Sequence, residues 1–364
     1  MSTEGDVGRT VRACRYCPMC HHADLTVTLE RRETYSARGR ALIRFGVEQG
    51  MTEWDADVAD VMYRFFADGL CRHVCAGHID HDEMVLDARH RLFAAGVSPP
   101  AVAQVRTNIQ TAGNPWGEKE PDLLALTGAR LKGEVFVYCG PTARIHRRST
   151  IRSMVKIFER IEVPFCVSPE EGDPGVLLYQ LGDCEGGMAA AAALFYRISK
   201  SGAQIVVTPD ADAYLALKVG FGGMPPLAGV TVLHASEFLA QHLGKLRLHE
   251  AESRNVAYHD PCVLARFAPC IAPPRAILRS ACHQTPLEIG LWSGPSASCS
   301  GECGGVPFTF PHLSNLAAVK RLEQARQVGA DIVVAGSPAS AMALEQAGGV
   351  PVQELCEFIG NSLA

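Results

Sequence analysis

The sequence has no long hydrophobic run and no excess of positive charge. Its longest apolar stretch, Met188 to Tyr196, is too short to cross a bilayer. The formal net charge of -5 argues against nucleic acid as a main partner. The first residues lack the charged-then-apolar pattern of a signal peptide. We therefore expect a cytoplasmic protein with reduced thiols that does not span a membrane. A peripheral position at the inner face of the membrane is the alternative.

The sequence also lacks the short motifs of many enzyme sites. It contains no G-x-S-x-G, no P-loop, no metalloprotease motif and no intact G-x-G-x-x-G after a strand. No residue pattern indicates a general base or a hydride acceptor. We therefore predict no catalytic residue in this chain and assign any substrate chemistry to a partner.

Cysteine, in contrast, occurs in an informative pattern. Fourteen cysteines in 364 residues are too few for a disulfide scaffold. Cys14, Cys17 and Cys20 form a C-x2-C-x2-C run, which is typical of ferredoxin-type iron–sulfur motifs. In the bacterial two-cluster pattern a fourth cysteine follows and binds the other cluster. Asp24 stands in that fourth position.

A second, incomplete motif ends at Cys71 and Cys75. Because the two clusters exchange their fourth ligands, one cluster keeps four thiols. They belong to Cys14, Cys17, Cys20 and Cys75. The other cluster keeps a single thiol among its positions Phe65, Asp68, Cys71 and Asp24. The sequence thus predicts one [4Fe–4S] cluster. A zinc knuckle, with His21 and His22 as added ligands, and a chance cluster of cysteines are the less specific alternatives.

The chain changes its hydrophobic pattern after about residue 110. Before it, apolar residues recur at helical spacing, as on one face of a helix that ends near Gly69. They are Val58, Val61, Met62, Phe65 and Phe66. After residue 133, near-continuous apolar runs predict strands of a buried parallel sheet, at 135–138, 205–208, 230–233, 256–258 and 332–334. Helical stretches such as 189–199 and 315–327 lie between them, so we expect an α/β region.

The α/β region is an internal duplication. Residues 202–207, GAQIVV, match residues 329–334, GADIVV, at an offset of 127. Gly175 pairs with Gly301 and Cys139 with Cys262 at slightly smaller offsets. We therefore predict a helical ferredoxin-like domain over 1–120, followed by two duplicated α/β domains with parallel sheets over 131–250 and 251–364.

These motifs together resemble the cysteine-rich (CCG) family of iron–sulfur subunits, similar to the glycolate oxidase iron–sulfur subunit and to heterodisulfide reductase-like subunits. The resemblance rests on the cysteine run, on Ser36-Ala37-Arg38-Gly39-Arg40 and on the turn from Gly113 to Gly117. In the second copy it rests on residues 259–262, HDPC, and 299–305, CSGECGG, where the family has C-C-G-x-G-G.

The chain departs from the family at most ligand positions of the two copies. In the first copy Asp173 and Pro174 replace the cysteines of C-C-G, and Asp210 and Ala213 replace those of C-x2-C. In the second copy serines stand at 300, 337 and 340. Because serine is a poor iron ligand, we expect these domains to hold no cluster. A single zinc or iron remains the alternative in the second copy, on His259, Cys262, Cys299 and Cys303.

Two polar segments have ordinary interpretations. The run from His78 to Glu83 is rich in potential metal ligands, but it overlaps a helix start, where a solvated cap is the better interpretation. The run of Arg144, His146, Arg147 and Arg148 indicates a solvated basic face, which an acidic partner or a phosphate could also contact.

The resemblance implies an iron–sulfur electron-transfer subunit of a multi-subunit oxidoreductase. It implies a flavoprotein (FAD-linked) partner that oxidises a 2-hydroxy acid such as glycolate or lactate, with a quinone or another carrier as acceptor. The competing hypothesis is a non-redox scaffold whose duplicated domains bind a partner and whose cluster is structural. A third is an independent enzyme with a metal at Cys262 and Cys299.

Overall fold

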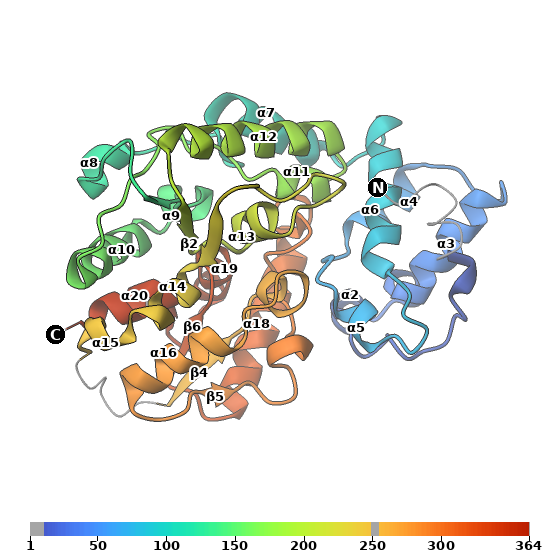
Figure 1. Cartoon of the computed structure of the whole chain (residues 1–364). Helices are drawn as coiled ribbons and strands as arrows, with labels where there is room; N and C mark the ends of the chain where they lie inside the picture. Colours follow the sequence, from blue (N-terminus) through green and yellow to red (C-terminus); the bar gives the residue numbers. More distant parts are fainter. Residues whose placement is uncertain (1–10, 249–254, 364) are drawn as a thin grey trace.

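The computed structural model describes residues 11–248 and 255–363. In the second part of the chain, helices alternate with the strands of two parallel β-sheets, which confirms the predicted α/β class (Figure 1). Within the described residues no helix is long and apolar enough to cross a membrane.

The first part of the chain is helical and forms a lobe at one side of the molecule (Figure 1, blue). Its elements are α2 (Leu25–Glu30), η1 (Glu33–Tyr35), α3 (Ala37–Glu48), α4 (Ala56–Tyr63), α5 (Leu70–Val74) and α6 (His81–Ala94). The following helix α7 (Pro100–Ala112) leads out of the lobe and ends at Gly113, whose φ of 72° is left-handed. The lobe has its own hydrophobic core, around Met62, Tyr63 and Val85.

The predicted helix over Val58 to Phe66 is shorter than expected. It ends at Tyr63, so that Phe65 and Phe66 lie beyond it and are buried in the adjoining turn. The buried Arg89 side chain explains this end, since its Nε donates to the carbonyl of Met62 at 3.0 Å. A side-chain donor thus replaces the backbone partner that a longer helix would have supplied.

The two sheets have the same strand order. In the first, β1 (Val135–Val137), β2 (Ile205–Thr208) and β3 (Thr231–His234) pair in the order β1-β2-β3. In the second, β4 (Val256–His259), β6 (Ile332–Ala335) and β7 (Val352–Glu354) pair in the order β4-β6-β7, with the two-residue β5 (Leu287–Glu288) outside β4. All these pairs are parallel. The repeated sequence in β2 and β6 therefore occupies the central strand of each three-strand set. We refer to these two units as the first copy and the second copy.

Helices surround both sheets. Those of the first copy are α8 (Leu123–Thr127), α9 (Pro141–Ile145), α10 (Arg148–Ile161), α11 (Val176–Gln180), α12 (Cys184–Ser201), α13 (Ala211–Lys218), α14 (Ala235–Gln241) and α15 (Leu243–Leu246). Those of the second copy are η2 (Val263–Phe267), α16 (Ala272–Cys282), η3 (Gly294–Ser296), α17 (Val306–Thr309), α18 (Pro311–Gln327), α19 (Pro338–Ala347) and α20 (Leu355–Asn361).

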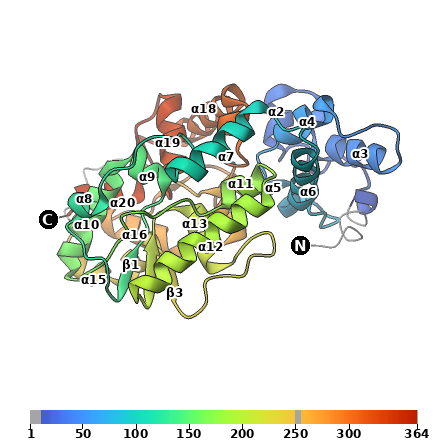
Figure 2. The same ribbon diagram turned by 90° about the horizontal axis from the view of Figure 1, so that it is seen from above.

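The two copies share one hydrophobic core. It includes Val137 and Val207 from the first sheet and Val256 and Val334 from the second. Helix α10 packs on α20 and α14 packs on α16, so each copy covers part of the other (Figure 2). Such a shared core fixes how the strand ends of the two copies face each other.

The basic run from Arg144 to Arg148 is a solvated face only in part. His146 and Arg148 are exposed, but the expectation was wrong for Arg144 and Arg147. Arg144 is fully buried and forms ion pairs with Glu120 and Glu171. Arg147 is also buried, and its Nη2 lies 2.6 Å from Glu357 of the second copy. Burial is tolerated because carboxylates compensate both guanidinium groups.

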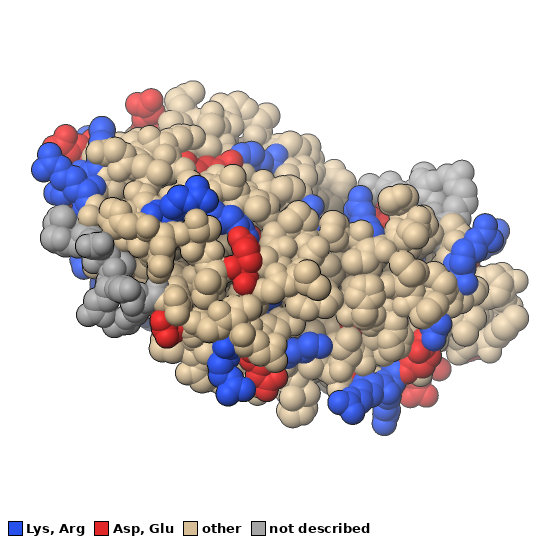
Figure 3. Space-filling model, turned by 90° about the horizontal axis from the view of Figure 1, so that it is seen from below, with Lys and Arg blue, Asp and Glu red and all other residues tan. Residues whose placement is uncertain are grey.

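The surface carries charges of both signs. On the face drawn in Figure 3, lysine and arginine side chains stand among acidic ones, with wide uncharged areas between them. This face therefore lacks the continuous basic surface that binding of a nucleic acid backbone requires.

Candidate metal centres

The four cysteines of the predicted cluster come from two segments of the helical lobe. Cys14, Cys17 and Cys20 lie in the irregular loop before α2, and Cys75 caps the end of α5. Cys14 and Cys20 are buried, Cys75 is half-buried and Cys17 is exposed. The guanidinium group of Arg38 holds this loop through a hydrogen bond to the carbonyl of Tyr16 at 3.2 Å.

The four cysteines act on one another electrostatically. Burial raises the pKa of Cys14, and the charges of Cys75 and Cys17 raise it further. Burial raises the pKa of Cys20 to about 11, with further contributions from Asp24, Cys14 and Cys75. The thiols are therefore neutral in the absence of a metal. Because metal ions bind the thiolate form, the positive charge of a bound metal would have to offset this effect of burial.

A buried arginine contacts two of the ligand positions predicted to be vacated. Arg40 lies 2.8 Å from Asp24, and its guanidinium group lies 4.7 Å from the ring centre of Phe65. The guanidinium group therefore compensates the buried charge of Asp24 and packs on Phe65.

Local sequence explains how Arg40 reaches this place. Ser36 caps the start of α3 by accepting a hydrogen bond from the backbone N–H of Gly39 at 3.0 Å. A side chain on Gly39 would lie 2.4 Å from the carbonyl oxygen of Glu33, so only glycine fits there. The Ser-x-x-Gly-Arg pattern is thus a tight helix start that directs Arg40 into the lobe.

Cys71, the remaining thiol of the incomplete motif, is fully buried. Burial raises its pKa, and the charges of Asp24, Asp68 and Cys20 raise it further. Asp24 and Asp68 stand at the positions predicted to be vacated, whereas Cys20 belongs to the predicted set of four. The electrostatics therefore do not separate Cys71 from the predicted ligands, and the choice of Cys75 as the fourth ligand stays a prediction.

A second group of thiols lies in the second copy. The sulfur atoms of Cys262, Cys299 and Cys303 are all buried and all within 4.8 Å of one another. Among the described residues this is the only group of at least three potential ligands that close together. We call these three residues the thiol triad. In a tetrahedral zinc site the ligand atoms are separated by about 4 Å, so the triad has the dimensions of a site for one soft ion.

The backbone of the triad also fits a shared ion better than a disulfide. Sulfur atoms of Cys262 and Cys303 are in contact, yet their Cα atoms are 7.8 Å apart. Ordinary disulfides hold the two Cα atoms within about 7 Å. The separation of Cys262 and Cys303 is therefore outside the range of ordinary disulfides.

The fourth residue predicted for this site, His259, does not belong to the group. Its Nδ1 accepts a hydrogen bond from Nε of Arg321 at 3.0 Å. The serines at the family's C-x2-C positions also have other partners. Ser337 caps α19, and Ser340 donates to Glu302 at 2.8 Å.

Among the other potential ligands near Cys75, Asp80 caps a helix as predicted, but His81 and Asp82 are buried and not solvated. The carboxylate of Asp80 accepts a hydrogen bond from the backbone N–H of Glu83 at 3.0 Å and so caps α6. The exposed Arg72 pairs with the same carboxylate.

Buried arginines connect the lobe with both copies. Nη1 of Arg89 donates to the carbonyl of Gln180 in the first copy at 2.9 Å and to that of Gly304 in the second at 2.7 Å. Arg266 of the second copy donates to the carbonyl of Asp68 at 2.6 Å. The thiol triad therefore lies against the lobe, and the charge of Asp68 contributes to the raised pKa of Cys299.

Comparison with known proteins agrees with this arrangement. Residues 256–345, which hold the whole thiol triad, match the family model of the cysteine-rich domain, CCG. This part of the chain is a CCG domain. The resemblance expected from the motifs is thereby confirmed.

Relatives extend the similarity over most of the chain. A probable membrane-anchored ferredoxin of Chromohalobacter salexigens is 29% identical over 317 residues, which is 80% of this chain and 47% of the relative. The probable iron–sulfur-binding oxidoreductase FadF of Bacillus subtilis is 26% identical over 74% of this chain and 41% of its own length. A dihydromethanophenazine:CoB–CoM heterodisulfide reductase subunit of Methanosarcina barkeri is 24% identical over 74% of this chain and 69% of its own length.

The chain spans about half the length of the first two relatives. Iron–sulfur subunits and oxidoreductases are common among its relatives, which supports a redox role with electron transfer.

The sequence alone did not reveal one feature of the site between the two copies. Residues that replace family ligands in the first copy, such as Asp173 and Asp210, line a cavity between the copies together with Trp116. The signal was present, because both aspartates stand at vacated ligand positions, but their convergence with the second copy depends on the fold.

Proposed function

We propose that this chain is an iron–sulfur electron-transfer subunit of a multi-subunit oxidoreductase. The proposal rests on the observation that four thiols lie near enough to affect one another's pKa, namely those of Cys14, Cys17, Cys20 and Cys75. They are the ligands we assign to one [4Fe–4S] cluster, while Arg40 takes the place of a second one.

The exposure of the ligands favours electron transfer over a purely structural cluster. Cys17 is exposed and Cys75 half-buried, so one side of the cluster would lie near the protein surface. A partner's cofactor can approach that side closely, whereas a structural cluster gains nothing from exposure.

We assign the donor and the acceptor to other proteins. The donor we propose is an FAD-linked dehydrogenase of a 2-hydroxy acid such as glycolate or lactate, and the acceptor is a quinone or another carrier. This proposal is supported by the absence of a general base or hydride acceptor from the sequence motifs. It is also supported by relatives named as subunits of reductases.

Anaerobic reduction tests the proposal. Protein purified without oxygen should contain about four irons per chain at the lobe and should give a paramagnetic signal on reduction with dithionite that disappears on reoxidation. Affinity purification from the native host should recover a flavoprotein that reduces the cluster when given its hydroxy acid. A cluster that cannot be reduced, or that breaks down on reduction, would favour the scaffold hypothesis instead.

The thiol triad supports a second metal centre with a single zinc or iron. Its three sulfurs are the soft donors that both ions accept. Replacement of Cys303 by serine should remove about one metal equivalent per chain in elemental analysis and leave the lobe cluster intact. Replacement of the half-buried Cys282, which lies outside the triad, is the matched control. Equal metal content in both variants would exclude this centre.

A further inference from the structure

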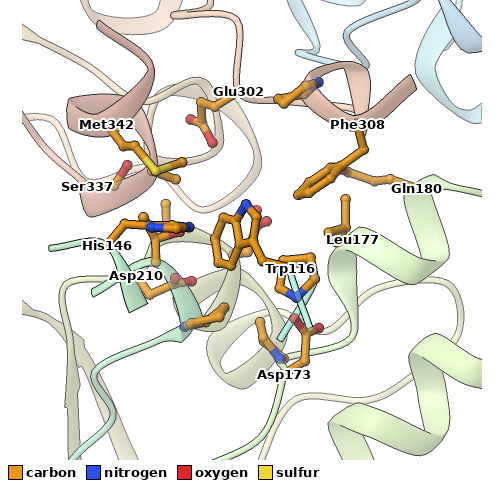
Figure 4. A pocket seen from close by; sticks show the side chains of 18 of the residues that line it. Trp116, His146, Asp173, Leu177, Gln180, Asp210, Glu302, Phe308, Ser337 and Met342 are labelled. Carbon is orange, nitrogen blue, oxygen red and sulfur yellow. The ribbon is translucent and has the colours of Figure 1, made fainter. Parts of the chain in front are cut away.

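A cavity of about 440 Å³ lies between the two copies (Figure 4). Its walls include the starts of α9, α13 and α19, which follow the strands β1, β2 and β6. The carboxyl ends of parallel strands are the usual place for a ligand in such folds. Trp116, from the turn after α7, completes the wall on the side of the lobe.

Four carboxyl groups line this cavity and no lysine or arginine does. They belong to Asp173, Asp210, Asp212 and Glu302. Figure 4 shows Glu302 entering from the second copy opposite Asp210 and Asp173, with the indole ring of Trp116 between them. The guanidinium group of Arg144, whose charge acts on Asp173 and Asp210, is already paired with Glu120 and Glu171. Burial raises the pKa of all four acids, so a bound cation would favour their charged form.

Hydrogen bonds hold three of these carboxyl groups in fixed positions. Asp173 accepts from the backbone N–H of Gly175 at 2.8 Å, and Asp210 accepts from that of Ala213 at 2.8 Å. Glu302 accepts from Ser340 at 2.8 Å. Each bond uses one oxygen of its carboxyl group, so the arrangement is formed before any ligand arrives.

One further polar side chain lines the cavity. Thr142 is only 5% exposed, and no hydrogen bond joins its hydroxyl to another described residue. Its hydroxyl oxygen is not among the fully buried atoms that lack a partner, so it can form a hydrogen bond with a ligand in the cavity.

The spacing of the acids distinguishes a metal ion from a larger cation. No three of the four carboxyl groups lie within 4.8 Å of one another, since the thiol triad alone meets that limit among the described residues. A bare divalent ion would need such convergence. The side chains of Trp116, Phe308 and Met342 add apolar and aromatic walls, which attract organic cations.

We propose that this cavity binds a small aliphatic amine in its protonated form. The ammonium group lies among the carboxylates, and its alkyl part lies against Trp116, Phe308 and Met342. Asp173 and Asp210 stand at positions where the CCG family has cysteines. In this proposal they provide a binding site for an amine in place of a site for a metal. The proposal does not depend on the redox role of the lobe.

Binding measurements on the full chain, purified anaerobically, test the proposal. The probes are n-butylamine and 1,4-diaminobutane, with the neutral 1,4-butanediol and magnesium chloride as controls. Calorimetry should show saturable binding of an amine and none of the diol or of magnesium. Asp212→Asn removes a carboxylate that has no hydrogen-bonding role in the described residues and should weaken amine binding by about tenfold.

Two further variants make the outcome decisive. Gln346→Lys places a competing cation at the exposed mouth of the cavity and should also weaken amine binding, even if Asp212→Asn does not fold. Asp57→Asn, an exposed acid on α4, should leave it unchanged. No binding of either amine at millimolar concentration would overturn the proposal. The proposal would also be overturned if the diol or magnesium bound as tightly as the amines, or if neither cavity variant changed amine binding.

Discussion

The first copy presents carboxyl groups at two positions where the second copy presents a thiol and a hydroxyl group. Asp173 stands at the position that Cys299 occupies in the second copy, and Asp210 stands at that of Ser337. The strand order is the same in both copies. The difference teaches that the same framework tolerates either chemistry, because backbone N–H groups of Gly175 and Ala213 donate hydrogen bonds that fix the two aspartates.

The helical lobe shows another way to lose a metal centre. There the vacated ligand positions close around Arg40, which leaves little space for a ligand. Between the copies the vacated positions remain open as a cavity. The guanidinium group of Arg40 therefore occupies the space between the predicted vacated positions in the lobe. No lysine or arginine lines the cavity between the copies, so that cavity stays open.

The largest expected effect is the difference between replacing Cys75, which we assign as a cluster ligand, and replacing Cys71, which we do not. Cys75→Ser should abolish the broad absorption of the cluster near about 400 nm, because it removes one of the four assigned ligands. Cys71→Ser should leave that absorption nearly unchanged, since Cys71 belongs to the vacated set. Visible absorption spectra of the two variants, both purified anaerobically, measure this difference. Bleaching by the Cys71 variant alone would reverse our assignment of ligands.

The next effect tests Arg40 as the replacement for a cluster. Arg40→Leu leaves the buried carboxylate of Asp24 without its partner and should cost about 3–5 kcal/mol of unfolding free energy. Urea denaturation followed by circular dichroism measures the loss. The double variant Arg40→Leu with Asp24→Asn removes both charges, keeps the cap of α2 and should recover most of it. Equal losses in single and double variants would show that packing matters more than charge.

A third prediction concerns the acids of the first copy. Burial raises the pKa of Asp173 to about 7, from an ordinary value of 3.8. Between these values the folded state binds more protons than the unfolded state, so the contribution of Asp173 to stability falls as pH rises from about 4 to 7. Asp173→Asn should therefore be more stable than the parent at pH 7, by at most about 4 kcal/mol, and equal to it near pH 4. Unfolding curves at the two pH values check this, and a difference that grows toward low pH would contradict it.

The smallest effect concerns the contact between the copies. Arg147 forms two hydrogen bonds with the carboxylate of Glu357, through Nε at 3.2 Å and Nη2 at 2.6 Å. Arg147→Lys keeps the charge but loses this forked geometry, so it should cost about 1 kcal/mol. The exposed Arg152→Lys serves as the control and should change nothing measurable. Thermal unfolding compares the two, and equal midpoints would mean that the fork adds no stability.

The sequence by itself determined the features that depend on local order. Apolar runs fixed the parallel strands, and the spacing of the cysteines predicted which thiols belong to one cluster. Asp80 was assigned correctly as a helix cap, because capping needs only the three residues that follow.

Only the tertiary structure decided which distant groups meet. The burial of Arg40, Arg144 and Arg147 depends on carboxylates that lie between 16 and 210 residues away in the chain. The convergence of Cys303 with Cys262 and the opening of an acidic cavity depend on how the copies and the lobe pack. Their shared core and buried arginines set those positions, because the charges of distant residues have no partner until the chain brings them together.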